Sequence, residues 1–151
     1  DLVARGKMQL GAAFAGIAIE NSMLGAAHAT ANPLTARFNV VHGMAVGAMM
    51  PHVIQWNARD EATARSYAQL SRETHVASSH DSVTESVDKL VAAMEGILKV
   101  TEIPSTLSAH GAQEADLDKL AEGASQQWTG NFNPVEITQA DYRSLYALAL
   151  G

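Results

Sequence analysis

Apolar side chains recur at helical spacing along most of this chain, and this periodicity constrains the fold more than any other feature. One segment places an apolar residue at every third or fourth position, as a helix with one buried face requires: Val83, Val87, Leu90, Val91, Met94, Ile97 and Leu98. No stretch alternates apolar and polar residues for long enough to predict a strand. The sequence therefore predicts an all-α fold, a helical bundle of about six or seven helices.

Further helices are predicted on both sides of this segment. Residues 60–73 form one with a polar exterior, and residues 117–128 form another whose buried face includes Trp128. Thr138 followed three residues later by Asp141 resembles a capping box, which predicts a helix from there to Leu150. Turns should separate these helices at residues 38–41, 78–81, 103–105 and 130–134.

A helix should also begin near His42 and end near Asn57. Pro51 falls inside it, where the ring would clash with the carbonyl of Gly47 and start a turn or kink. The methionines of this helix lie at helical spacing and are interpreted as adaptable core residues: Met44, Met49 and Met50.

The N-terminal third differs, because residues 4–36 are rich in Ala, Gly and Met and are apolar on more than one face. A helix that is apolar nearly all round is normally buried between other helices, so burial is predicted here. Gly11, Gly16 and Gly25 would each weaken an isolated helix. They fit better where another backbone or a ligand approaches closely.

Composition limits the class of protein. With 151 residues, 47% of them hydrophobic and 17% charged, the chain is globular and long enough for one domain. A net charge of -6 without a Lys/Arg cluster argues against nucleic acid and anionic membrane surfaces as partners. Cysteine is absent and no apolar run has the length of a membrane span, so we expect no thiolate metal site and a cytoplasmic location. The chain begins at Asp1 without an initiator Met, which suggests a piece of a longer protein.

Two histidines carry the chemistry that the sequence suggests. His28 and His42 are 14 positions apart, about 21 Å along one straight helix, so they can share a metal ion only if the chain reverses between them. Asn39, Val40 and Val41 are a plausible place for that reversal. A histidine at a helix start tends to be neutral, which is the form that ligates metal. On spacing alone, two buried or helix-start histidines without a metal remain the simpler interpretation.

The surrounding residues resemble a known signature. A small-residue helix carries His28, Pro33-Leu34 follows, His42-Gly43 opens the next helix, and Pro51-His52 and Asn57 close the pattern. This arrangement is similar to the iron-containing (group III) alcohol dehydrogenases. The likeness extends outward over essentially the whole chain, through Lys7-Met8, residues 103–107, Asn133-Pro134 and the C-terminal helix.

The resemblance implies a dehydroquinate synthase-like C-terminal helical domain, residues 1–151, from a two-domain enzyme. In that family an N-terminal domain binds NAD or NADP, and the helical domain holds one Fe(II), sometimes Zn, through an Asp and three His. His28 and His42 match the last two of those ligands. The implied reaction is reversible hydride transfer between a small alcohol or aldehyde and the nicotinamide. The nucleotide domain and the first ligand pair are not found in this sequence, so this chain alone is expected to be inactive.

One position departs from the family pattern. Many members carry a further His immediately before the Pro-Leu, whereas this chain has Asn32. A carboxamide has no pKa in the working range, so Asn32 cannot act as a general base. It can still orient a water or a substrate oxygen, and we assign it that catalytic role.

Two alternatives stay open at this stage. The chain could be a non-catalytic helical binding domain, or part of another metal-dependent enzyme of the same architecture. Because earlier helices would be missing, apolar faces of residues 4–36 should be exposed and favour a homo-oligomer. The remaining histidines and large aromatics are interpreted as structural: His52 packed near a kink, His75, His80 and His110 on the surface, and Phe38, Trp56 and Trp128 in helix contacts.

Overall fold

A computed structural model describes residues 1–151 and contains helices but no strands, which confirms the all-α prediction. The seven α-helices are α1 (Leu2–Ser22), α2 (Ala26–Phe38), α3 (His42–Asn57), α4 (Glu61–Glu73), α5 (Val83–Val100), α6 (Leu117–Ser125) and α7 (Gln139–Leu150). Short 3-10 helices occupy the connections: η1 (Ser108–His110), η2 (Glu114–Asp116) and η3 (Trp128–Phe132).

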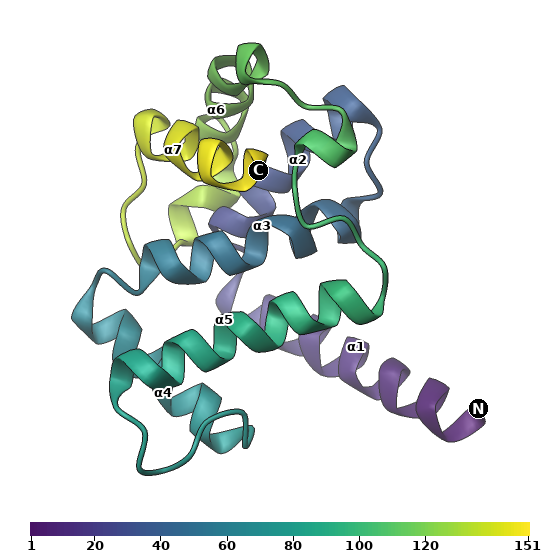
Figure 1. The fold of residues 1–151 in the computed structure, drawn as a ribbon, viewed down its shortest axis with the longest axis vertical. Helices are drawn as coiled ribbons and strands as arrows, with labels where there is room; N and C mark the ends of the chain where they lie inside the picture. Colours follow the sequence, from purple (N-terminus) through teal and green to yellow (C-terminus); the bar gives the residue numbers. More distant parts are fainter.

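Helix α3 lies at the centre of the body, between two groups of helices (Figure 1). On one side α2, α6 and α7 pack with α3 around the main core, which is built largely from Ala, Leu and Tyr side chains. On the other side α5 crosses α3 over a small cluster and pairs with α4. The chain reverses direction in the loop between α2 and α3, two helices that both contribute to the main core.

Local sequence signals set several of the helix ends. A capping box starts α5, where Ser82 and Glu85 exchange side-chain and backbone hydrogen bonds. A second capping box starts α7 at Thr138 and Asp141, as predicted. These boxes satisfy backbone N–H groups that have no partner inside the helix.

Removing the Thr138 hydroxyl should weaken the start of α7. Thr138→Ala is expected to lower the free energy of unfolding by about 1 kcal/mol, because the Asp141 amide loses its acceptor. Urea unfolding followed by circular dichroism measures this change. Thr138→Ser keeps the hydroxyl and serves as the control; equal losses in both variants would show that the cap does not stabilise the helix.

Of the turn or kink predicted at Pro51, the turn is wrong, because α3 continues as one helix from His42 to Asn57. The proline removes one backbone hydrogen bond from the helix interior. Its neighbours Ala48, Met49 and Val53 are buried in the core, and this packing keeps the segment helical. Met49 is fully buried, and Met44 and Met50 pack against the core, so the interpretation of these methionines is confirmed.

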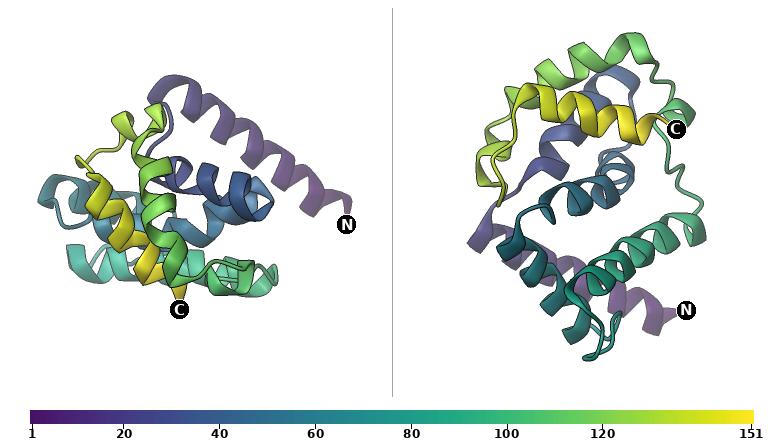
Figure 2. Two further views of the ribbon diagram at one scale, coloured as in Figure 1. Left: turned by 90° about the horizontal axis from the view of Figure 1, so that it is seen from above. Right: turned by 60° about the vertical axis from the view of Figure 1, so that its left-hand side comes forward.

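The burial predicted for residues 4–36 is found in α2, whose inner face lies in the core, but not in α1, where the expected exposure of apolar side chains is found instead. Helix α1 has no buried residue, and its large apolar side chains are exposed. Figure 2 shows it extending away from the body of the molecule. The chain breaks after α1 at Met23, whose φ is 63°, and α2 continues at 110° to it. No single helix is long and apolar enough to cross a membrane; taken together, the bent pair of α1 and α2 meets that test by length and composition.

Only one of the three glycines singled out in this region lies at a close approach. A Cβ on Gly25 would lie 3.2 Å from Oδ1 of Asn133, so a side chain there would press on the residue that caps α2. Gly11 and Gly16 have no neighbour within 4 Å of such an atom. Their helix is exposed, so nothing in this chain approaches them.

Helix α6 is shorter than its apolar pattern predicts. It ends at Ser125, and the backbone becomes extended at Gln127 before η3 begins. Trp128 therefore leaves the buried face of α6 and is 55% exposed, so its prediction as a core residue is wrong. It packs edge-on against Phe132, with ring centroids 5.9 Å apart.

Candidate metal centre

The fold brings the two predicted metal ligands together. His28 lies in the first turn of α2 and His42 is the first residue of α3. Asn39 adopts a left-handed conformation with φ 55°, which ends α2 and allows the chain to reverse. The imidazole centroids of His28 and His42 are 5.4 Å apart and their planes are tilted by 47°. The chain reversal inferred from the sequence is therefore confirmed.

This spacing fits two ligands of one ion. A metal–nitrogen bond of about 2.1 Å puts the centroid of a ligating imidazole roughly 3.2 Å from the ion, so two rings at a tetrahedral angle lie roughly 5 Å apart. Imidazole nitrogens ligate both Fe and Zn. The centroid spacing and the imidazole donors thus fit two ligands of one ion.

The surroundings favour a neutral imidazole at His28. Burial lowers the pKa of His28, and the neighbouring His42 ring lowers that pKa further. Gly43 has no atom within 4 Å of a Cβ built on it, so the space beside His42 is open. A neutral ring next to open space can accept a ligand.

The His28–His42 pair has no third ionisable ligand beside it in this chain. No group of three or more His, Cys, Asp or Glu side chains comes close enough together to hold an ion.

Asn32, the residue that departs from the family pattern, lies one turn after His28 on the half-buried face of α2. Its Nδ2 donates to Oε1 of Gln127 at 2.8 Å. Gln127 in turn donates from Nε2 to the carbonyl of Gly123 at 3.3 Å. Sequence reasoning missed Gln127, because it is 95 positions from Asn32 and no local motif marks it.

An amide pair anchors the start of the helix that carries His28. Asn57 is 1% exposed, and its Nδ2 donates to Oδ1 of Asn133 at 3.1 Å. Asn133 returns a hydrogen bond from its Nδ2 to Oδ1 of Asn57 at 2.7 Å. The same Asn133 oxygen accepts from the backbone N–H of Ala26, the first residue of α2. Two asparagines far apart in the sequence therefore fix where α2 begins, which positions His28.

A second long-range contact holds α2 from the opposite side. Tyr146 is fully buried in the main core, and its hydroxyl donates to the carbonyl of Thr30 at 2.7 Å. Burial raises the pKa of Tyr146 far above its ordinary value, so the hydroxyl stays protonated and donates. Thr30 is two residues after His28, so α7 contributes directly to the placement of the His28–His42 pair.

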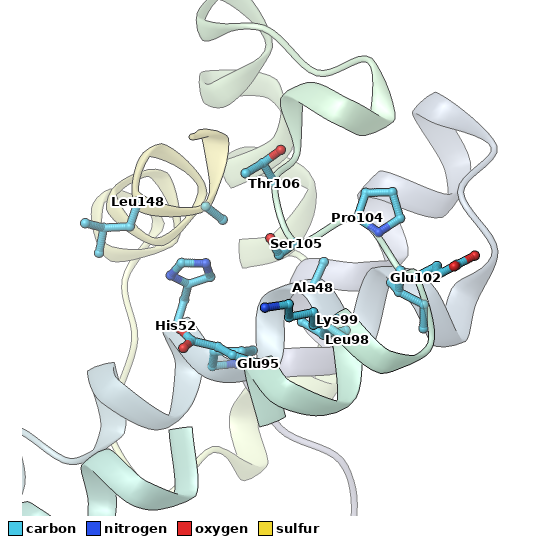
Figure 3. A pocket seen from close by; sticks show the side chains of 13 residues that line it. Ala48, His52, Glu95, Leu98, Lys99, Glu102, Pro104, Ser105, Thr106 and Leu148 are labelled. Carbon is cyan, nitrogen blue, oxygen red and sulfur yellow. The ribbon is translucent and has the colours of Figure 1, made fainter. Parts of the chain in front are cut away.

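The largest pocket lies elsewhere, and none of His28, Asn32 and His42 lines it. It has a volume of about 610 Å³ between α3, α5, the segment after α5 and the end of α7. Figure 3 shows the His52 ring pointing from α3 toward Leu148 of α7, with Glu95 and Lys99 of α5 beside it. Burial lowers the pKa of His52 and the Glu95 carboxylate partly offsets this.

The other histidines and aromatics divide between confirmed and corrected predictions. His75 and His80 are exposed, as predicted. His110 is half-buried rather than on the surface, because its Nε2 lies 3.0 Å from the carbonyl of Pro104. Phe38 and Trp56 pack against the main core, as predicted; the guanidinium of Arg59 also stacks on Trp56 at 3.8 Å.

Comparison with known proteins finds relatives along the whole chain. Residues 1–150 match the C-terminal part of the Fe-containing alcohol dehydrogenase family. The chain is 31% identical over 149 residues to the bifunctional aldehyde-alcohol dehydrogenase of Escherichia coli, across 87% of this chain and 17% of that enzyme. It is 32% identical over 143 residues to lactaldehyde reductase of the same organism, across 95% of this chain and 37% of that enzyme.

The fold has solved counterparts as well. An archaeal halo-thermophilic alcohol dehydrogenase from a Red Sea brine pool superposes with a TM-score of 0.88 at 24% identity, across 99% of this chain and 38% of that chain. The chain thus spans less than two fifths of the length of each protein that it matches here.

Proposed function

Because the chain belongs to the iron-containing alcohol dehydrogenase family and matches its C-terminal part, we propose that it is the metal-binding helical domain of an oxidoreductase. The proposed reaction is reversible: an alcohol loses hydride to NAD or NADP and a proton to solvent, and the aldehyde forms. The observation that supports this most directly is the approach of the His28 and His42 rings to 5.4 Å. Fe(II) is the proposed metal, with Zn as the alternative, since imidazole accommodates both.

His28 and His42 are the proposed ligands from this chain. A divalent ion bound there would supply Lewis-acid polarisation of the substrate oxygen. The anchored start of α2 and the left-handed turn at Asn39 hold the two rings in place without a ligand, so the pair is preorganised. An Asp and a His from a preceding segment are the expected remaining ligands, and the nucleotide is expected on a preceding domain.

Asn32 is proposed to orient the substrate hydroxyl. It lies one turn after His28 and cannot take up a proton at working pH. It therefore contributes a hydrogen bond, and the proton released by the alcohol leaves by another route. Alcohol and aldehyde substrates are proposed from the activities of the relatives, which include a lactaldehyde reductase and an aldehyde-alcohol dehydrogenase.

A non-catalytic binding domain is the second candidate for this polypeptide by itself. The exposed apolar side chains of α1 favour it, because a patch of this kind usually contacts another protein segment. The two candidates differ in whether His28 and His42 bind a metal ion.

Cobalt titration of the chain tests the proposal. With two imidazoles the ion is held weakly, so dialysed protein should retain no stoichiometric metal. Millimolar Co²⁺ should nevertheless broaden the imidazole NMR signals of His28 and His42 together, in one saturable step. His42→Ala should abolish that step at His28, since chelation needs both rings. His75→Ala, at an exposed histidine, is the matched control and should leave the step unchanged.

Two results would contradict these expectations. If His28 responds to Co²⁺ equally with and without His42, the two rings do not share an ion and the proposed site fails. If the chain alone oxidises alcohols with NAD(P) at a rate that His42→Ala abolishes, its expected inactivity is wrong.

A further inference from the structure

We infer that Gln127 is a positioning residue that fixes the side-chain amide of Asn32 so that its oxygen, and not its nitrogen, faces the site of the His28–His42 pair. The inference rests on the proposed function for its chemical meaning. Its structural content, the orientation of one amide by another, can be tested separately.

The direction of two hydrogen bonds carries the inference. Gln127 uses its Nε2 to donate to the carbonyl of Gly123, a group that can only accept. Its Oε1 is therefore the atom on the other branch, and it accepts from Nδ2 of Asn32 at 2.8 Å. Nδ2 of Asn32 is thereby committed to Gln127. The Oδ1 atom of Asn32 makes no hydrogen bond within the chain and remains available as an acceptor.

The packing of α6 on α2 holds the hydrogen bonds of Gln127 to Gly123 and Asn32 in place. A Cβ on Gly123 would lie 3.2 Å from Cγ of Pro33, the residue directly after Asn32. Glycine at 123 thus lets α6 approach α2 closely at this point. The backbone N–H of Gln127 also donates to the carbonyl of Ala124, which fixes the chain immediately after α6. Both amides are half-buried, so water competes for them less than at the surface.

Asn32 lies on the same face of α2 as His28, the first of the two proposed metal ligands. Residues four apart on a helix lie on the same face, so Asn32 sits directly beyond His28. Both side chains are half-buried, whereas Ala29, Thr30 and Ala31 between them are fully buried on the core side. Asn32 therefore lies on the same face of α2 as His28, whose ring centroid is 5.4 Å from that of His42.

An acceptor at this position distinguishes between ligands. A hydroxyl group can donate to it, as an alcohol or a water molecule does, whereas the carbonyl oxygen of an aldehyde cannot. A freely rotating asparagine would offer either its oxygen or its nitrogen. Gln127 removes that choice, and so sets Asn32 to hold the alcohol form of the substrate by its hydroxyl hydrogen.

Variants at position 127 separate retention, loss and reversal of this orientation. Gln127→Glu loses the donor to the Gly123 carbonyl but keeps an oxygen acceptor for Asn32, so it should retain the native orientation of the Asn32 amide. Gln127→Ala removes the acceptor, and exchange of the Asn32 Nδ2 protons with solvent should become roughly tenfold faster. Gln127→Lys supplies only a donor, so Asn32 should rotate and present Nδ2 to the site. Gln126→Ala, at the exposed neighbouring residue, is the matched control.

Two NMR measurements on the full chain give the readout, with circular dichroism melting used to select folded variants. The first is the separation and solvent exchange of the Asn32 Nδ2 proton signals. The second is the change in the Asn32 Cγ shift when ethanol is added with Zn²⁺. A hydroxyl bonded to Oδ1 should move this shift in the native chain and in Gln127→Glu, but not in Gln127→Lys. If Gln127 had only a structural role, ethanol would move the Asn32 Cγ shift in Gln127→Lys as it does in the native chain.

The outcomes also separate this inference from the proposed function. If Gln127→Ala and Gln127→Lys fold and leave the Asn32 proton exchange and the ethanol response unchanged, the inference is wrong even when Co²⁺ binds the His28–His42 pair. If Co²⁺ fails to reach that pair while Gln127→Lys still reverses the Asn32 amide, the orientation is correct and the proposed function fails.

Discussion

Truncation of Tyr146 to alanine is expected to lower the free energy of unfolding by about 3–5 kcal/mol, the range for large aromatic side chains removed from a core. Tyr146 is fully buried among α2, α3 and α7, and its hydroxyl is bonded to the carbonyl of Thr30. The truncation therefore leaves a cavity and removes a tie to the helix that carries His28. Urea unfolding followed by circular dichroism measures the loss.

The same helix supplies the control. Leu148 is 60% exposed on α7, so Leu148→Ala should change the free energy of unfolding by no more than about 0.5 kcal/mol. Tyr146→Phe keeps the ring and should lower the free energy of unfolding by about 1 kcal/mol. This loss measures the contribution of the hydroxyl hydrogen bond to Thr30. If Tyr146→Ala costs no more than Leu148→Ala, α7 does not form part of the cooperative core.

Two glutamates on α1 should convert the chain from an associating species to a monomer. Phe14 and Ile17 are each 61% exposed, on a helix without a single buried residue. Burying such a side chain contributes about 1.5–3 kcal/mol, so losing both should weaken association by roughly 100-fold or more. Sedimentation equilibrium should give the native chain a mass above 16.0 kDa and Phe14→Glu/Ile17→Glu the monomer mass. Glutamate forms helices well, so α1 should persist.

A control with equal added charge tests whether association depends on α1. Leu70→Glu/Val100→Glu changes two exposed apolar residues on α4 and α5 and should leave association intact. A native chain that sediments strictly as a monomer at all concentrations would contradict the prediction, and so would equal dissociation by both double variants.

Features encoded by neighbouring residues could be predicted from the sequence. The bounds of α3, the capping box at Thr138 and the reversal before His42 all depend on residues within a few positions of one another. The approach of His28 to His42 was predictable for the same reason, since one turn of chain separates their helices. The family resemblance added the prediction that these two histidines bind a metal ion.

Features that depend on distant partners could not be predicted. Gln127 meets Asn32 across 95 positions, and Asn133 meets Asn57 across 76. Trp128 follows the apolar period of α6, but the helix ends before it, so periodicity placed it on the wrong surface. The composition of α1 indicates that this helix suits burial, yet burial requires a partner, and none of the described helices covers it.

The Asn133 side chain, which accepts a hydrogen bond from the first residue of α2, also determines when α2 can be anchored during synthesis. Ala26 receives its acceptor from Asn133, which is 107 positions later in the chain, and a ribosome adds that many residues in roughly 5–20 s. Tyr146, the other tie to α2, emerges later still. The helix bearing His28 therefore leaves the ribosome before either anchor exists, and the two imidazoles acquire their fixed spacing only when the last helices have been translated and docked.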